Sequence, residues 1–177
     1  MTAPRIRAAT KADVPAIARV HVQVWNESYR GLVPDALLAA LSVERNARMW
    51  ETIIDSGEQT ATHVVETDAD IVGFGSATKA RDERLGTSGE VTSIYLIDRI
   101  RRRGLGRALF ASLLRTLAER GHASVGLWVL VNNAPTRRFY EALGGRPAAA
   151  RTLENSHGDL PEIAYVWDDL RRFAIAG

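Results

Sequence analysis

The sequence contains no cysteine among its 177 residues. Disulfides, thiolate nucleophiles and thiolate metal sites are therefore excluded, and a reducing cytoplasm fits this composition. No run approaches about 18 consecutive apolar residues, the length that a membrane helix needs, and the first residues do not have the pattern of an export signal. We expect a soluble, cytoplasmic protein without a membrane partner.

Lysine is also scarce, with two lysines against 21 arginines. The formal net charge is only +2, which does not by itself indicate nucleic-acid binding. For most arginines a coding-composition bias explains the excess. One cluster differs, because it places five arginines within nine residues and so suggests a phosphate-bearing ligand: Arg99, Arg101, Arg102, Arg103 and Arg107.

Internal repeats, low-complexity tracts and long linkers are missing as well. Hydrophobic residues make up 46% of the chain and charged residues 25%, which are ordinary globular proportions. We therefore predict one domain over residues 1–177.

Hydrophobic periodicity predicts an α/β domain. In the first half we expect a short strand, three helices of which Asp13 caps the first and Ser42 the third, and a hairpin with its turn at 68–70. The second half predicts alternating strands and helices, then two more strands. The predicted strands are 6–9, 62–66, 71–77, 90–97, 123–131, 146–153 and 161–168, and the helices with two defined ends are 35–41, 104–120 and 135–143.

The most informative segment is the basic, glycine-spaced loop between strand 90–97 and helix 104–120. The first amides of a helix have no intrahelical acceptor and, with the helix dipole, favour an anion. Gly104 and Gly106 remove side chains that would keep a phosphate from the backbone, and the arginines add charge-assisted contacts. The segment predicts a pyrophosphate site.

Other anion and metal motifs do not fit. A dinucleotide fingerprint needs a third glycine where Leu109 stands, and the connector 98–103 is too long for it. Walker-type Gly-Lys-Ser or Gly-Lys-Thr does not occur. The four histidines lack His-Glu-x-x-His spacing, so no metal is expected.

Two motifs of the sequence resemble those of a known family. Arg101-x-x-Gly104-x-Gly106, which opens a helix after a strand, is similar to the acetyl-coenzyme-A loop of the GNAT N-acetyltransferases. A second match lies downstream, where the segment from Asn133 through Tyr140 to Gly144 resembles the family's next helix. The segment 22–34 resembles one branch of the family. Thr136 and Asp98 depart from the family pattern, where Ala and Pro are usual, without removing a chemical group that the reaction needs.

The resemblance implies a mixed, mostly antiparallel twisted sheet of six to seven strands with about four flanking helices and a splayed central strand pair. It implies acetyl-coenzyme A (acetyl-CoA) as cosubstrate, whose pantetheine arm bonds to the backbone of Tyr95, Leu96 and Ile97 and to Asn133. The pyrophosphate would contact the loop residues Arg101, Arg102, Arg103, Gly104, Leu105, Gly106 and Arg107.

The implied reaction is direct attack of a primary amine on the thioester in a ternary complex. Alkyl amines, with a pKa near 10.4, are protonated at neutral pH, so a base is required. Glu90 stands where some family members carry this base, acting directly or through water, and Tyr140 would protonate the leaving thiolate. Trp25 and Tyr29 are candidates for the acceptor pocket, and Trp128, Glu162 and Tyr165 are weaker ones.

Other roles stay open for these residues. Glu90 is equally compatible with an edge carboxylate or a salt-bridge partner, and Tyr140 with a core residue. The alternative function is a non-catalytic CoA-binding regulatory module. A nucleic-acid partner is disfavoured, because Phe110, one of the aromatics nearest to the arginines, lies on the predicted core stripe. The acceptor's identity is undetermined, and a homodimer is possible.

Overall fold

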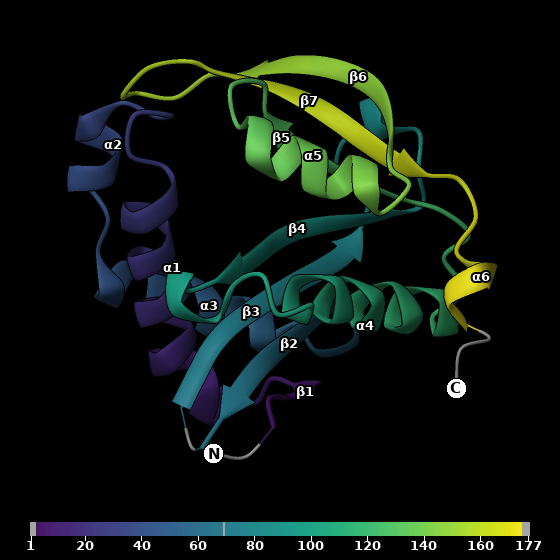
Figure 1. Ribbon diagram of the computed structural model, residues 1–177, viewed down its shortest axis with the longest axis horizontal. Coiled ribbons are helices and arrows are strands. Elements are labelled where there is room, and N and C mark those ends of the chain that lie inside the picture. Colours follow the sequence, from purple (N-terminus) through teal and green to yellow (C-terminus); the bar gives the residue numbers. More distant parts are fainter. Residues whose placement is uncertain (1–2, 69, 175–177) are drawn as a thin grey trace.

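The computed structural model describes residues 3–68 and 70–174 and contains one seven-stranded sheet (Figure 1). The strand order is β1-β2-β3-β4-β5-β7-β6, and every neighbouring pair is antiparallel except β4 and β5. The mixed, mostly antiparallel sheet of seven strands confirms the predicted fold class. The strands are β1 (Arg5–Ala8), β2 (Thr60–Thr67), β3 (Asp70–Lys79), β4 (Gly89–Leu96), β5 (Val125–Leu130), β6 (Arg146–Leu153) and β7 (Leu160–Trp167).

The predicted helices are present, with some ends moved. Helix 35–41 ends earlier, at Ala39, and strand 123–131 is shorter at both ends. The predicted turn 68–70 includes Ala69, which lies outside the described residues. Within the described part of the chain no helix is both long and apolar enough to cross a membrane. The helices are α1 (Val14–Ser28), α2 (Asp35–Ala39), α3 (Val43–Asp55), α4 (Leu105–Glu119), α5 (Ala134–Ala142) and α6 (Arg171–Ala174).

Helices α1 and α4 cover opposite faces of the central strands. Phe74 on β3 packs against His21 of α1, with the ring centroids 5.9 Å apart. A Cβ atom on the adjacent Gly75 would lie 2.8 Å from Cδ1 of Leu113 on α4. Because successive strand residues point to opposite faces, the two helices sandwich the sheet.

The central strands β4 and β5 separate almost as soon as they meet. They pair in parallel over only two residue pairs, Gly89 with Val125 and Glu90 with Gly126. Beyond this point β4 continues beside β3 as far as Leu96, whereas β5 pairs with β7. Figure 1 shows the two strands diverging toward α1. The predicted splayed pair is therefore confirmed.

His21 is a neutral, half-buried residue that packs beside the core on the α1 side. Its Nδ1 accepts a hydrogen bond from the indole N–H of Trp50 (3.0 Å), and its ring lies 5.3 Å from that of Tyr95. Burial lowers the pKa of His21 to about 4. The folded protein therefore resists protonation at a group that an unfolded chain protonates readily.

We predict an acid sensitivity that originates at His21. Between pH 6.5, its ordinary pKa, and about pH 4, the unfolded chain binds a proton here that the folded chain does not. The contribution of His21 to the free energy of unfolding should fall by about 3 kcal/mol across this interval. Urea unfolding of the wild type and of His21→Gln at pH 7, 5.5 and 4.5 measures the difference. His157→Gln, at an exposed position, is the control, and an equally steep loss in His21→Gln would contradict the prediction.

Candidate active site

The N-terminus of α4 presents open backbone amides. The first helical amide with an intrahelical partner is that of Ala108, which donates to the Gly104 carbonyl oxygen (3.0 Å). No side chain caps this end, and Gly104 itself has a φ of 77°. The amides of Leu105, Gly106 and Arg107 therefore precede the helical ladder, as an anion site requires.

The arginines of this loop divide into two groups. Arg101 donates from Nε to the Leu96 carbonyl oxygen (2.8 Å) and from Nη2 to Ser28 Oγ (2.6 Å), and its Nη1 lies 2.6 Å from Asp98 Oδ1. Its guanidinium thus fastens the loop to β4 and α1. The other four side chains of the cluster are exposed: Arg99, and around the helix start Arg102, Arg103 and Arg107.

Gly106 sits where α4, β4 and α5 approach one another. A Cβ atom there would lie 3.3 Å from Cζ of Phe139 and 3.6 Å from Cδ1 of Leu96. A side chain at this position would therefore press on Phe139 of α5 and touch the end of β4.

The backbone of β4 offers hydrogen-bonding groups to its open side. The N–H of Ile97 donates to the Val72 carbonyl oxygen (3.1 Å), so the polar groups of Ile97 point toward β3. Strand alternation directs those of Tyr95 the same way and those of Leu96 toward the open side. Of the three residues expected to bond pantetheine, Leu96 has the required backbone direction.

Glu90 is buried at the point where the strands separate, with 3% of its surface exposed. Its Oε2 accepts from the backbone N–H and from Nε of Arg81 (both 3.0 Å), and its Oε1 accepts from Nη2 of the same residue (2.8 Å). The salt-bridge role weighed for Glu90 is therefore real. The Arg81 side chain is 66% exposed, so it can leave the carboxylate without disturbing the core.

Aromatic side chains line the α1 side of the open strand pair. Trp25 stacks on Tyr29 at a centroid distance of 4.6 Å, and Tyr29 meets the Tyr95 ring edge-on at 6.5 Å. Burial raises the pKa of Tyr29 well above its ordinary value, and it also raises the pKa of Tyr95. These phenols stay protonated at neutral pH and form a neutral wall.

Tyr140 approaches from the opposite side, on α5. It is 7% exposed and packs against core rings, with centroids 6.1 Å from Phe110 and 5.3 Å from Phe139. Burial, with a smaller contribution from Tyr95, raises its pKa. Tyr140 is therefore a core residue as well as a protonated phenol near the β4 aromatics.

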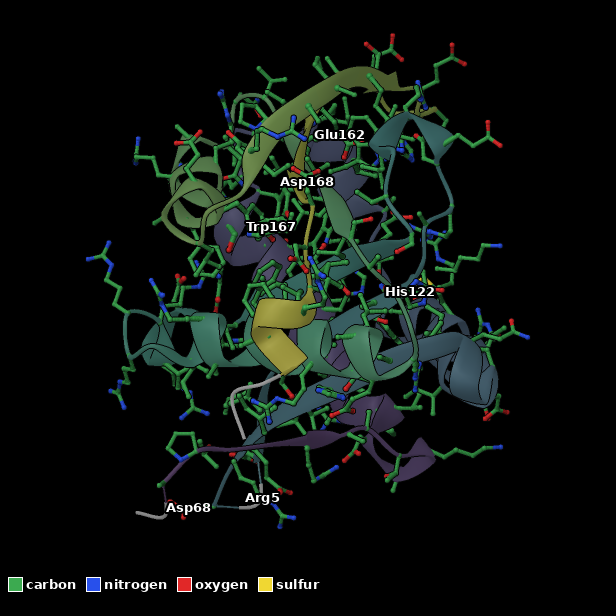
Figure 2. All side chains as sticks on the ribbon, turned by 90° about the vertical axis from the view of Figure 1, so that its right-hand side faces the viewer. Arg5, Asp68, His122, Glu162, Trp167 and Asp168 are labelled. Atoms are coloured by element: carbon green, nitrogen blue, oxygen red, sulfur yellow. The ribbon has the colours of Figure 1, made fainter. Side chains whose placement is uncertain are left out.

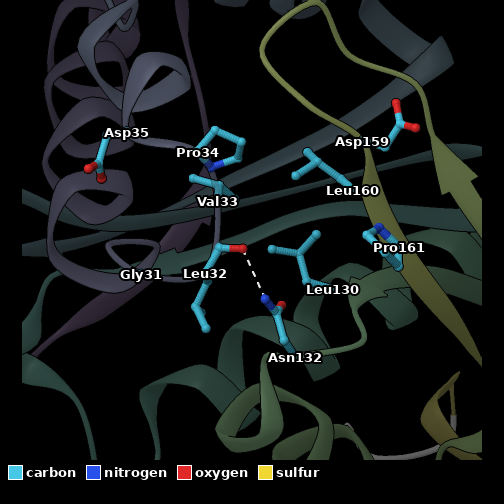
Figure 3. A pocket seen from close by; sticks show the side chains of 10 residues that line it. All are labelled: Gly31, Leu32, Val33, Pro34, Asp35, Leu130, Asn132, Asp159, Leu160 and Pro161. Carbon is cyan, nitrogen blue, oxygen red and sulfur yellow. Dashed lines mark hydrogen bonds between the residues drawn. The ribbon is translucent and has the colours of Figure 1, made fainter.

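Two cavities open on the α1 face of the sheet. The first, about 420 Å³, lies between residues 31–35, the end of β5 and residues 159–161 (Figure 3). Asn132 closes it by donating from Nδ2 to the Leu32 carbonyl oxygen (3.0 Å). The second, about 660 Å³, is lined by Glu90 and by charged residues: Arg81, Asp82, Glu83, Arg84 and Arg151.

An ion-pair network joins the second cavity to the last two strands. Arg151 on β6 contacts Asp82 (2.9 Å) and Glu162 on β7 (2.6 Å), and Asp82 also pairs with Arg84 (2.8 Å). Figure 2 labels Glu162 on its strand. Tyr165, by contrast, points into the core beside α5, where its hydroxyl donates to Glu141 Oε1 (2.5 Å). Glu162 therefore adjoins the second cavity through Arg151, and Tyr165 lies in the core.

Asn133 begins α5 and caps it. Its Oδ1 accepts a hydrogen bond from the backbone N–H of Thr136 (3.2 Å), and the residue is 6% exposed. This capping bond uses the side-chain oxygen and leaves the cofactor contact expected of Asn133 to its Nδ2 amide group.

Sequence reasoning missed Arg81, Arg84 and Arg151, which shape the second cavity. No motif marks them. Arg81 and Arg151 find partners on other segments, Glu90 and Glu162 respectively, whereas Arg84 pairs with Asp82 in its own loop. Alternation within β5 gave a weak signal for Trp128, whose large polar-edged ring stands between buried aliphatic residues.

Comparison with known proteins identifies the family. The chain matches the acetyltransferase (GNAT) family over residues 20–145. It therefore belongs to the GNAT family, and it is an N-acetyltransferase. Uncharacterized N-acetyltransferase YuaI of Bacillus subtilis (strain 168) is 31% identical over 165 residues, which cover 93% of each chain. Probable N-acetyltransferase Rv2775 of Mycobacterium tuberculosis (strain ATCC 25618 / H37Rv) is 27% identical and covers 91% of each.

Solved structures support the same fold. The Thermoplasma acidophilum PaiA N-acetyltransferase in complex with coenzyme A has a TM-score of 0.69 at 13% identity, with 94% of this chain and 100% of that one covered. YncA of Salmonella typhimurium, a putative acetyltransferase solved with acetyl-CoA, has a TM-score of 0.68 at 18% identity and covers 94% of both chains.

We predict that Asn133→Ala lowers the free energy of unfolding by about 1 kcal/mol, because the N-cap bond to Thr136 is lost. Asn133→Asp keeps the accepting oxygen and should retain most of the stability. Denaturant unfolding of the two variants measures the difference. Equal losses in both would show that the capping bond does not account for the effect.

Proposed function

We propose that this protein transfers the acetyl group of acetyl-CoA to a primary amine by direct attack in a ternary complex. One observation carries the proposal: the open edge of β4 leads directly to the uncapped N-terminus of α4. This arrangement fits an extended pantetheine arm along the strand edge, with the attached pyrophosphate at the anion-binding helix start. We propose that residues 1–177 form one catalytic domain, because all strands of the described residues belong to one sheet.

The loop supplies the cosubstrate site. The amides of Leu105, Gly106 and Arg107 and the exposed guanidinium groups of Arg102 and Arg103 would bind the pyrophosphate. Arg101 would hold the loop in place rather than touch the phosphates, since its guanidinium is bonded to Leu96, Ser28 and Asp98. The Leu96 N–H and Asn133 Nδ2 would bond the pantetheine amides. The crystal structures of PaiA and YncA, which contain coenzyme A and acetyl-CoA, support this choice of donor.

Glu90 would remove a proton from the bound ammonium, directly or through water. Its carboxylate is bonded to Arg81, so the arginine has to release at least one oxygen before Glu90 can accept a proton. The neutral amine would then attack the thioester carbonyl, and the tetrahedral intermediate would collapse with loss of the thiolate. Tyr140 would give its phenolic proton to that sulfur. The second proton of the attacking nitrogen, released as the amide forms, would restore the phenol through solvent, and Glu90 would return its proton to solvent. Trp25 and Tyr29 would border the acceptor.

We predict that Glu90→Gln and Tyr140→Phe each lower kcat about 100-fold or more, because each removes a proton-transfer group. The KM for acetyl-CoA should change less than about twofold. Thiol release from acetyl-CoA, measured against a panel of amines, gives both parameters.

Arg81→Gln separates the base from the salt bridge. If Glu90 serves as base, Arg81→Gln keeps far more activity than Glu90→Gln does. If Glu90 only anchors Arg81, the two variants lose activity equally. A protein that binds acetyl-CoA but turns over no amine would favour the regulatory module.

A further inference from the structure

Three buried side-chain polar atoms lack a hydrogen-bond partner among the described residues. One is Trp25 Nε1 on α1, and the other two are Ser93 Oγ on β4 and Trp128 Nε1 on β5. A buried polar group without a hydrogen bond costs about 1–3 kcal/mol. Such groups are rare in native proteins and require an explanation.

The two atoms occupy the same level on opposite sides of the open strand pair. The last β4–β5 pair is Glu90 with Gly126. Thr92 is the extra residue of a bulge against β3, so Ser93 is two register positions beyond Glu90 along β4. Trp128 is likewise two positions beyond Gly126 along β5.

Both side chains are also on the same face of the sheet. Tyr95, two residues after Ser93, faces the aromatic side chains of α1. Leu127 and Val129 belong to the core cluster with α4, so the intervening Trp128 points to the other face, that of α1. The two donors therefore flank the α1 side of the opening.

Apolar contacts cover this face at both ends, and two arginines lie over it between them. A Cβ atom on Gly126 would lie 3.1 Å from Leu85 Cδ2, and Leu130 packs in a cluster with Val33 and Leu160. Between these ends, Arg84 and Arg151 lie over the Trp128 ring at 5.8 and 4.2 Å, and both line the cavity that contains Glu90. Trp128 thus lies directly behind two of the arginines that line the Glu90 cavity.

The charges of this cavity indicate what kind of group it binds. Its arginines are each paired with a carboxylate: Arg81 with Glu90, Arg84 with Asp82, and Arg151 with Asp82 and Glu162. An anionic ligand would have to displace one of these carboxylates. An uncharged oxygen would accept hydrogen bonds from the indole N–H and the serine hydroxyl without breaking an ion pair.

We propose that the acceptor is an amine bearing an uncharged carbonyl oxygen next to its amino carbon, as in an amino acid amide or a peptide N-terminus, and that Ser93 Oγ and Trp128 Nε1 bind this oxygen. The inference rests on the proposed function, since it places the amine at Glu90. Two register positions along a strand span about 7 Å, which is the distance along the sheet from Glu90 to the level of the two donors. An amine bonded to Glu90 and a carbonyl bonded to the two donors fit this span.

Three acceptors with the same side chain test the proposal: leucinamide, leucine, and 3-methylbutylamine, which lacks the carbonyl group. Each kcat/KM is calculated for the protonated amine, the form from which Glu90 is proposed to remove a proton. We expect leucinamide to exceed the other two by about tenfold or more. Trp128→Phe and Ser93→Ala should each lower kcat/KM for leucinamide about 3- to 10-fold, the range for one neutral hydrogen bond, and leave 3-methylbutylamine within about twofold.

A matched control and a binding measurement make the result independent of turnover. Trp50→Phe removes an indole N–H that is bonded to His21, away from the cavity, and should leave the leucinamide preference unchanged. Calorimetry of leucinamide binding to the CoA-saturated protein should show a Kd about 3- to 10-fold weaker in Trp128→Phe. Thermal unfolding of each variant verifies that it is folded.

Several outcomes would overturn the inference. An unchanged preference and Kd in both variants would mean that ordered water satisfies the two donors. A loss confined to the KM for acetyl-CoA would assign them to the cosubstrate, and a preference for leucine would mean that the site binds an anion. Absence of turnover together with the expected shift in Kd would contradict the proposed function and support this binding site.

Discussion

The structure depends on the early separation of β4 from β5. Backbone groups on a strand edge need partners, and here the two strands supply each other with partners over only two residue pairs. From there β5 pairs with β7, while β4 ends in a loop that Arg101 fastens to Ser28 and in which the Asp98 N–H donates to Glu27 Oε2 (3.0 Å). The opening is therefore held by contacts on both sides. It brings an unsatisfied strand edge next to the open amides of α4, which is where a chain with amide groups and a pyrophosphate can bind.

The same separation accounts for the distribution of charge. The loop before β4 crosses the base of the opening and pairs with residues from three strands, through Arg81 to Glu90 and through Asp82 to Arg151, which in turn contacts Glu162. Partly buried ion pairs of this kind contribute geometry more than stability. They leave a cavity whose charges are internally balanced, beside a neutral wall of Trp25, Tyr29 and Tyr95. Selectivity for the acceptor then rests on neutral hydrogen-bond donors and on shape.

Much of the fold followed from local patterns. The leucine stripe of α4, the hairpin of β2 and β3 and the alternation of β4, α4, β5 and α5 were all predicted, because periodicity reports which face of an element is buried. Ends moved by a few residues where the strand ladder loses a donor. The Val131 N–H donates to the Pro161 carbonyl oxygen (2.9 Å), but proline has no N–H to continue the pairing. The start of α4 and its flanking glycines were also predicted from the sequence, since an open helix N-terminus is a local property of the chain.

By itself the sequence determined the anion-binding loop between β4 and α4, since its glycines, arginines and helix start are neighbours in the chain. It also determined the candidates Glu90 and Tyr140 through resemblance to a family. Only the tertiary structure decided that Glu90 is bonded to Arg81, that the guanidinium of Arg101 fastens its own loop, and that Ser93 and Trp128 face one opening. The reason is physical: these contacts join segments whose approach depends on the pairing of the whole sheet, and no short-range pattern encodes that pairing.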